Sequence, residues 1–388
     1  MKKAIALAFA LVVAVGATAA AIAKPTAKAS ASATTAVSCS KVKIAFMAPL
    51  TGPAGFLGTE QLSWAQYANK TLPSQGYPKV GMLVGDTQLD PALASSLAQK
   101  YVSDPTVMAV IGPSTSGGVA AAGPTFTDAK LPAISPSATR ASLTKGSDRI
   151  QGFWRDVPDD SVQGPSDARF MISKGAKKVV IIDDQEIYST GLADAATGTL
   201  KAKGVEVIRL SVSQSVTDFS SFVTKVPSDA DFVFLPWQQP PAAQTFAQQM
   251  AEQGKKATIM GSDGTNSPDQ FKASGAFVSN FAPDITAIAA DKQLIAGWQK
   301  ANAGKTVGSF GPPSYGAVQI ALSAIKKACA DKKGSISRSD VYFRVNGVKI
   351  KNWLLGGSFA FSTKTHDPKN GKFYIFQIGS DGKYKFVS

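Results

Sequence analysis

The sequence predicts an α/β protein with two doubly wound parallel-sheet lobes that are joined by a multi-strand hinge. Short apolar runs of the β type alternate with helical patterns along the chain, and this alternation is typical of βαβ units in a parallel sheet. After residue 155 the alternation starts over. The 388 residues are enough for two domains of ordinary size, and 44% hydrophobic residues is typical of globular proteins.

The first half of the chain contains four predicted strands. Parallel strands are covered by helices on both faces, so they are expected to appear as short, nearly continuous apolar runs. Pro124 lies in the helical pattern before the fourth strand, and that helix must therefore begin near Gly123 or bend there. The predicted strands are 42–47, 80–84, 107–111 and 131–134, and the predicted helices between the first three are 60–69 and 91–102.

The second half repeats this plan, and the C-terminal segment adds two helices, two strands and a hairpin turn at 380–382. The predicted helices are 166–174, 191–203, 219–226, 242–253, 292–303 and 315–330, and the predicted strands are 178–182, 205–210, 231–235, 257–260, 358–361 and 372–377.

This order of elements requires the chain to cross between the lobes more than once. A hinge of several connecting segments suits the closing of a cleft on a ligand. We assign residues 41–157 and 283–354 to lobe 1, and residues 158–282 and 355–388 to lobe 2.

The N-terminus has the parts of a secretory signal. Two lysines precede an apolar run that begins at Ala4 and ends in small residues near Ala23. We interpret residues 1–23 as a signal peptide and residues 24–40, which are rich in Ala, Ser, Thr and Lys, as a flexible leader. An uncleaved membrane anchor is the competing interpretation. Both predict an exported protein, in the periplasm or on the outer face of the cytoplasmic membrane.

The chain has two cysteines, Cys39 and Cys329. Two cysteines in an exported protein are expected to pair, so we predict a structural disulfide that ties the start of the folded chain to a late helix. Lipid modification of Cys39 is the alternative. It is disfavoured because the apolar run ends far upstream and the triplet 36–38 resembles a lipid signal poorly.

The net charge falls from +14 to +12 once the two lysines of the signal, Lys2 and Lys3, are removed. Such a charge is compatible with a nucleic-acid partner or an anionic surface. The lysines are, however, scattered over helix ends and turns, with no Arg-rich block and no interleaved aromatic residues. The pattern therefore favours a solvated basic surface, and we expect no nucleic-acid partner.

Small hydroxyl residues follow two neighbouring strands of the first half, where the carboxyl end of each strand meets a helix. Loops at these ends are where open α/β sheets place small polar ligands, because hydroxyls and the N–H groups of a helix start converge there. The sequence thus predicts a site for an anion such as a carboxylate. The hydroxyl residues are Ser114, Thr115 and Ser116 after the first strand, and Ser135, Ser137 and Thr139 after the second.

The residue inventory gives little support for catalysis. The only histidine, His366, lies in a turn-like segment, where one exposed histidine makes neither a triad nor a metal site. The acidic run 183–186 follows a strand and is compatible with metal binding or acid–base chemistry, although such runs are more often solvated loops or helix starts. We therefore expect no catalytic residue, no metal and no cofactor.

Several motifs resemble those of the branched-chain amino-acid (leucine/isoleucine/valine) substrate-binding proteins of ABC transporters. The resemblance extends from Lys41 to the end of the chain, in order and at matching spacing. It implies a type I periplasmic-binding-protein fold. The motifs are IAFMAPLTGPAGFLG at 44–58, VIGPSTSGG at 110–118, LPAISPSAT at 131–139, FWRDVPDDSVQGP at 153–165, DDQEIYSTGLA at 183–193 and IMGSDG at 259–264.

This resemblance implies a set of ligand-binding residues. By analogy with the family, lobe 1 holds a ligand carboxylate through Ser116, Ala138 and Thr139, with Ser114 and Ser137 as neighbours. Lobe 2 contributes Tyr188 and an acid that receives the ligand ammonium, here Asp263, one methylene shorter than the glutamate usual in the family. A further aromatic residue corresponds to Trp237. Where the family often has an aromatic residue, this chain has Phe56-Leu57, which implies the loss of a hydroxyl; Leu57 is expected to line the pocket for the ligand side chain, together with Phe56 and Trp237.

We therefore expect a solute-binding protein that captures an amino acid or a similar small carboxylate between two lobes and delivers it, as a monomer, to an ABC-transporter permease. Closure on the ligand would select the form that the permease recognises. Two other classes remain open at this point: a ligand sensor on the same fold, and an amidase or hydrolase that uses the acidic run.

Overall fold

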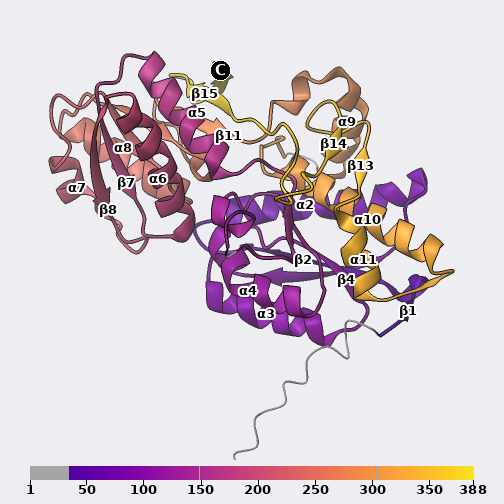
Figure 1. The fold of residues 1–388 in the computed structure, drawn as a ribbon. Helices are drawn as coiled ribbons and strands as arrows, with labels where there is room; N and C mark the ends of the chain where they lie inside the picture. Colours follow the sequence, from indigo (N-terminus) through magenta and orange to yellow (C-terminus); the bar gives the residue numbers. More distant parts are fainter. Residues whose placement is uncertain (1–34, 148, 303–304) are drawn as a thin grey trace, which may run out of the picture.

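The computed structural model describes residues 35–147, 149–302 and 305–388, which form two lobes that each contain a parallel sheet (Figure 1). The predicted fold class is confirmed. The predicted signal peptide, and residues 24–34 of the predicted leader, lie outside the described residues. No helix in the described ranges is both long and apolar enough to cross a membrane.

The first sheet has five parallel strands in the order β3-β2-β4-β5-β6. Both faces of strand β2 are apolar: Phe46 faces the core that contains α2 and α10, whereas Met47 faces the core of α3 and α4. The bounds are β2 Lys43–Ala48, β3 Gly81–Asp86, β4 Val107–Ile111, β5 Ala133–Ser135, β6 Phe153–Arg155, α2 Gly55–Thr71, α3 Pro91–Ser103 and α4 Ser116–Asp128.

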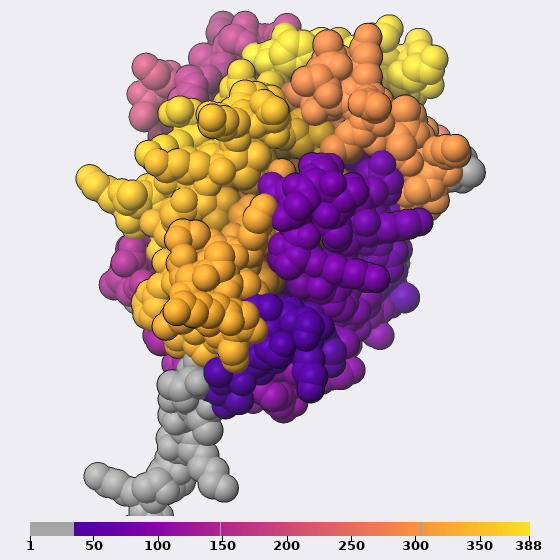
Figure 2. All heavy atoms as spheres, turned by 90° about the vertical axis from the view of Figure 1, so that its right-hand side faces the viewer, coloured from indigo at the N-terminus to yellow at the C-terminus, as the bar shows by residue number. Residues whose placement is uncertain are grey.

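The C-terminal part of the chain completes this lobe. Helix α10 packs along α2, and its apolar face joins a core that includes a stacked pair of indoles, Trp64 and Trp298. Figure 2 shows this contact in the view turned by 90°: the N-terminal part of the chain, in indigo and purple, lies against the C-terminal part, in orange and yellow. The added elements are α9 Lys292–Ala301, α10 Gly311–Asp331, α11 Arg338–Val345, β13 Lys349–Ile350 and β14 Phe359–Ala360.

The second sheet has the strand order β16-β15-β11-β10-β9-β7-β8. Strand β15 runs antiparallel to both of its neighbours, β11 and β16. Its strand β7 is again apolar on both sides, with Ile182 toward α7 and α8 and Ile181 toward α5 and α6. The bounds are α5 Asp160–Ser173, β7 Lys178–Asp183, α6 Ile187–Ala202, β8 Glu206–Ser211, α7 Ser220–Thr224, β9 Phe232–Leu235, α8 Pro240–Glu252, β10 Thr258–Gly261, β11 Phe277–Asn280, β15 Tyr374–Ile378 and β16 Tyr384–Phe386.

Three chain segments connect the two sheets, and each contributes to one hydrophobic cluster. Val157, Phe281 and Phe373 come from the three segments, and Leu57 and Phe310 pack against them from the first lobe. The tail between β14 and β15 stays on the first lobe, since Phe359 and Phe361 belong to its core. This packing leads us to propose a tail boundary near residue 371 in place of the predicted 355.

The predicted disulfide between Cys39 and Cys329 is confirmed, with Cα atoms 6.1 Å apart. It joins residues 290 positions apart in the sequence. Next to it, β1 (Val37–Ser38) pairs with β12 (Ser335–Ile336). In the chain-entropy model, closing a loop of this length stabilises the fold by about 6 kcal/mol.

Two local predictions need correction. Of the two predicted alternatives for the helix that holds Pro124, a start near Gly123 is wrong, because α4 begins at Ser116 and continues through Pro124; a bend there stays a prediction. His366 is not an exposed loop residue: it is half-buried, and its ring stacks on the Trp154 indole with centroids 4.5 Å apart. The burial of His366 comes from tertiary packing, because Trp154 and the Phe153 carbonyl that its ring contacts are distant in the sequence.

Candidate functional site

The candidate site lies where the carboxyl edges of the two sheets face each other. In lobe 1 the strand order reverses between β2 and β4, and in lobe 2 it reverses between β7 and β9. In open α/β sheets, loops at such points diverge and leave room for ligands. The predicted site residues follow β2, β4, β5, β7, β9 and β10, which is why the fold brings most of them to this edge.

The loop after β4 starts with a glycine that the backbone requires. Gly112 has φ +110°, and a Cβ atom there would lie 2.2 Å from the Met47 carbonyl oxygen. The chain then enters α4, where Thr115 caps the helix by accepting a hydrogen bond from Gly118 N at 3.2 Å. Ser116 is the first residue of this helix. The first-turn N–H groups have no acceptor within the helix, so they favour an anion.

Two of the predicted serines are engaged within lobe 1 by Gln61 of α2. Ser114 Oγ donates to Gln61 Oε1 at 2.5 Å, and Gln61 Nε2 donates to Ser137 Oγ at 2.8 Å. Ser137 Oγ in turn donates to the Ser114 carbonyl oxygen at 2.6 Å. All three side chains are buried. Ser114 and Ser137 therefore hold the two loops together, and Gln61, which the sequence analysis missed, completes the network.

Ser116, Ala138 and Thr139, the other predicted residues of lobe 1, differ in whether they keep a hydrogen-bond donor free for a ligand. Ser116 Oγ accepts from Arg140 N at 3.2 Å, which leaves its hydroxyl proton free to donate. The buried Thr139 Oγ1 has no hydrogen-bond partner within the described chain. The Ala138 N–H, by contrast, donates to Ser135 Oγ at 3.0 Å and is used inside the loop. The geometry thus favours the Ser116 and Thr139 hydroxyls over Ala138 N.

A buried arginine, Arg155, holds the loop that follows β5 by hydrogen bonds to its backbone. Arg155 Nη1 donates to Ala138 O at 2.8 Å and to Arg140 O at 3.0 Å. Its Nε pairs with Asp367 Oδ1 at 2.7 Å, and the Arg155 side chain is fully buried. A charged group of this kind is stable in the interior because its donors are matched. Arg155 therefore orders the loop without presenting its charge to a ligand.

On lobe 2, the predicted site residues Asp263 and Tyr188 contact each other. Tyr188 Oη donates to Asp263 Oδ1 at 2.6 Å, and both side chains are buried. Asp263 opens the short helix η4 (Asp263–Thr265) directly after β10. Burial raises the pKa of the Asp263 carboxyl to about 6, while the hydrogen bond from Tyr188 opposes that rise.

Asp160, at the start of α5, is a residue that the sequence analysis did not assign to the site. Its backbone N donates to Thr139 O at 2.9 Å, which places it between the two lobes. No described residue makes a well-aligned hydrogen bond to either carboxylate oxygen of Asp160; the Thr139 hydroxyl lies close to this carboxylate and lowers its pKa, but by less than burial raises it. Burial, and then the nearby Asp263, hold the pKa of Asp160 well above its usual value. We call Ser116, Thr139, Asp160, Tyr188 and Asp263 the interlobe site.

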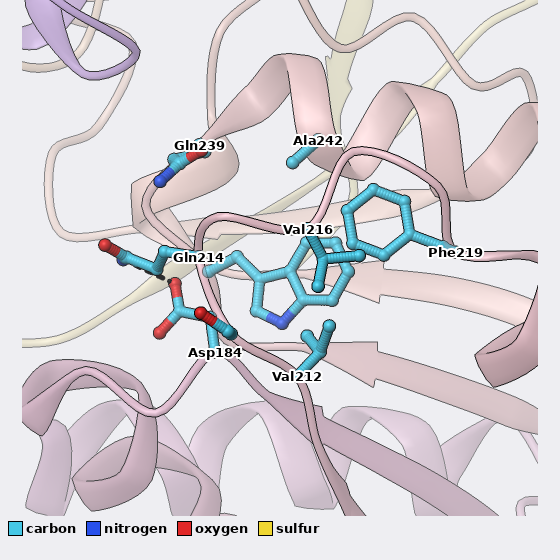
Figure 3. A pocket seen from close by; sticks show the side chains of 9 residues that line it. Asp184, Val212, Gln214, Val216, Phe219, Gln239 and Ala242 are labelled. Atoms are coloured by element: carbon cyan, nitrogen blue, oxygen red, sulfur yellow. Dashed lines mark hydrogen bonds between the residues drawn. The ribbon is translucent and has the colours of Figure 1, made fainter.

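The side chains of Trp237 and Leu57 pack in hydrophobic clusters, although the Trp237 carbonyl oxygen accepts from Ser262 Oγ at 3.2 Å, next to Asp263. The Trp237 indole packs against Phe219 and Phe246 in the core of lobe 2, and its Nε1 donates to Ile182 O at 2.6 Å. Beside it is a hollow of about 10 Å³, room for about one water molecule. In Figure 3, Val212, Val216 and Phe219 line this hollow, and Asp184 and Gln214 are joined by a hydrogen bond at its edge. This packing favours a core role for Trp237.

The side chain of Leu57 belongs to the hydrophobic cluster of the three connecting segments, with Val157 and Phe281.

The acidic run 183–186 also has structural partners: Asp183 pairs with Arg209 at 2.9 Å, Asp184 accepts from Gln214 at 2.9 Å, and Glu186 caps α6. Within the part of the chain that the structure describes, no group of three or more His, Cys, Asp or Glu side chains is arranged to hold a metal ion.

The fold and this site define a two-lobed binding protein, and comparison with known proteins agrees. The chain belongs to the periplasmic binding protein family, whose model matches residues 41–383. The resemblance to the branched-chain amino-acid substrate-binding proteins is thereby confirmed.

Among its relatives is the Leu/Ile/Val-binding protein homolog 1 of Brucella abortus, which is 28% identical over 361 residues that cover 89% of this chain and 93% of that protein. Two solved structures share the fold. The leucine-binding protein LivK of Thermotoga maritima has a TM-score of 0.80 at 22% identity, covering 89% of this chain and 98% of LivK. LivJ of Streptococcus pneumoniae, solved with isoleucine, has a TM-score of 0.78 at 24% identity, covering 89% and 99%.

Proposed function

We propose that this protein is the exported solute-binding component of an ABC transporter. It captures an amino acid or a similar small carboxylate between its lobes and delivers it, as a monomer, to a membrane permease. The names of its relatives, which bind leucine, isoleucine and valine, support a branched-chain amino acid as the first candidate.

One observation carries this proposal: hydroxyl donors on lobe 1 lie near buried carboxylates on lobe 2 that have no cationic partner. Ser116 and Thr139 offer donors beside the start of α4, which suits a carboxylate. Asp160 and Asp263 offer acceptors that lack a cationic partner, which suits an ammonium group. An α-amino acid carries both groups on one carbon atom, so it can satisfy both lobes at once.

The same geometry supports binding without turnover. A hydrolase needs a nucleophile with a base in hydrogen-bond reach. The residues of the acidic run, which the alternative hydrolase hypothesis requires, are committed to Arg209, Gln214 and the start of α6. We therefore infer that the ligand leaves the protein unchanged.

The proposal is tested by a thermal-shift screen of the purified mature protein against amino acids, their amides and small aromatic acids. A ligand that binds only the folded state raises the apparent melting temperature. We expect the largest shift for a branched-chain amino acid, with one-to-one stoichiometry by calorimetry and no product by mass spectrometry. Turnover of any compound would contradict the proposal, as would a screen in which only compounds without an ammonium group bind.

A further inference from the structure

Arg140 connects the carboxylate side of the interlobe site to the opposite lobe. It follows Thr139 directly, and its backbone N donates to Ser116 Oγ at 3.2 Å. Its side chain extends to lobe 2, where Nη1 donates to the carbonyl oxygen of Ile187 and lies 3.4 Å from Thr190 Oγ1. Arg140 Nε donates to Ser142 Oγ at 2.9 Å, which orients the guanidinium.

The first turns of α4 and α6 are close together at this point. Helix α6 has a glycine where the arginine crosses: a Cβ atom at Gly191 would lie 3.0 Å from Arg140 Nη1. On the facing helix, a Cβ atom at Gly117 would lie 3.0 Å from Glu186 Oε2. Glycine at both positions therefore allows the two helix starts to approach each other closely.

We propose that Arg140 is a positioning residue that holds the two lobes together before a ligand binds. Its contacts to Ile187 and Thr190, which we call the Arg140 clasp, join the lobes without using the groups that the interlobe site offers to a ligand. The inference deepens the proposed function and rests on it for its biological meaning.

The clasp has a kinetic consequence. A ligand that must close the lobes itself binds with an affinity reduced by the small fraction of closed protein. By raising that fraction, the clasp strengthens the apparent affinity, and by resisting reopening it slows dissociation. A hydrogen bond from a charged donor that is partly exposed should change the closed-to-open ratio by about tenfold.

The first experiment measures the lobes without any ligand. Dyes attached through Lys100→Cys on α3 and Lys203→Cys after α6, both at exposed positions, report the interlobe distance by single-molecule energy transfer. Arg140→Ala should shift the population toward longer distances, and Arg140→Lys should lie between it and the wild type. An unchanged distribution in Arg140→Ala would overturn the inference.

Arg344→Ala is the matched control, because this half-buried arginine contacts Asp331 and Asp340 within lobe 1 only. It should leave the interlobe distance unchanged, and a shift equal to that of Arg140→Ala would also overturn the inference. Because this readout needs no ligand, it succeeds or fails independently of the proposed function. With L-leucine as the probe, Arg140→Ala should raise the dissociation rate about tenfold.

Gly191→Ala approaches the clasp from the other lobe. Alanine is a better helix former than glycine, so this variant should keep or raise the thermal stability of lobe 2. Its methyl group should nevertheless displace the guanidinium and open the lobes. In the Arg140→Ala background, Gly191→Ala should have no further effect on the distance, because the displaced group is absent. An additive effect of the two substitutions would contradict the clasp.

Discussion

The two halves of the interlobe site differ in how their polar groups are satisfied. In lobe 1, Ser114 and Ser137 are bonded to Gln61, and Arg155 orders the following loop. In lobe 2, Tyr188 bonds Asp263, but no described residue makes a well-aligned hydrogen bond to either oxygen of Asp160. The lobe 1 half uses most of its polar groups in internal hydrogen bonds and presents hydroxyls, whereas the lobe 2 half holds buried acids whose pKa values are raised by burial.

This difference indicates a division of labour. The hydrogen-bond network of lobe 1 fixes the positions of its two loops without any contact from a ligand. Lobe 1 therefore determines where a ligand carboxylate would lie. Buried acids without a cationic partner destabilise the free protein, and an ammonium group would relieve that cost. Lobe 2 is therefore expected to supply most of the binding energy that depends on ligand charge.

The largest effect should come from Asp263→Asn, which removes the charge and keeps the shape. Losing one partner of a buried charge pair costs roughly 2–5 kcal/mol, so affinity for L-leucine should fall about 30-fold to several-thousand-fold in calorimetry. Asp291→Asn, which removes a buried acid beside α9 in lobe 1, is the control and should bind nearly as the wild type does. Unchanged affinity in Asp263→Asn would remove the ammonium role.

The same variant should be more stable than the wild type at pH 7.5. Because the folded pKa of Asp263 is about 6, above the usual 3.8, its contribution to stability is present at low pH and lost as the pH rises through about 6. The loss is on the order of 2–3 kcal/mol. Asp263→Asn should therefore melt at a higher temperature at pH 7.5 but show little difference at pH 4, as measured by calorimetric scans.

A smaller effect is expected from pH itself. An ammonium ligand needs the ionised form of Asp263, whereas the free protein carries the proton below about pH 6. Affinity for L-leucine should be level above that pH and fall by up to about tenfold per unit below it. Titrations between pH 4.5 and 8 check this slope, which Asp263→Asn should flatten. A level profile in the wild type would show that Asp263 does not titrate on binding.

The lobe 1 network gives the next smaller effect. Gln61→Leu leaves the buried hydroxyls of Ser114 and Ser137 without their partner, which should cost about 1–3 kcal/mol of stability. Affinity should fall by only about three- to tenfold, because the loops are loosened and not removed. Gln66→Leu, at an exposed position of the same helix, should change neither quantity. A larger affinity loss than in Asp263→Asn would reverse the proposed division of labour.

The smallest effect on binding is expected from Trp237→Phe. The substitution removes the hydrogen bond to Ile182 O and some packing against Phe219, so stability should fall by about 1 kcal/mol. Affinity should stay within about twofold of the wild type. A loss near that of Asp263→Asn would restore Trp237 to the ligand site.

The sequence predicted the fold well because strand periodicity and crossover length are local signals. Strand β4 occupies the predicted residues 107–111, and the disulfide follows from the count of cysteines. The hydroxyl loops were predicted because the ends of parallel strands meet at one edge, and Asp263 was predicted from the resemblance to the family; their ligand roles stay predictions.

The residues that were missed depend on tertiary contacts. Gln61 occurs in a helical pattern, where a glutamine usually faces solvent, and only its partners 53 and 76 residues away show that it is buried. Asp160 resembles a helix-start residue, and its burial between the lobes depends on Thr139. Trp237 has the same local pattern whether it lines a ligand or a core. No local signal distinguishes these cases.

The disulfide described above also determines how the molecule would respond to a pulling force at its N-terminal end. Without it, tension at Val37 would act on β1, whose two-residue pairing with β12 would unzip easily. The bond at Cys39 instead transfers the tension to Cys329 and so to α10, the long helix at the centre of lobe 1. A protein held by its N-terminal end could thus be pulled without stretching the hinge.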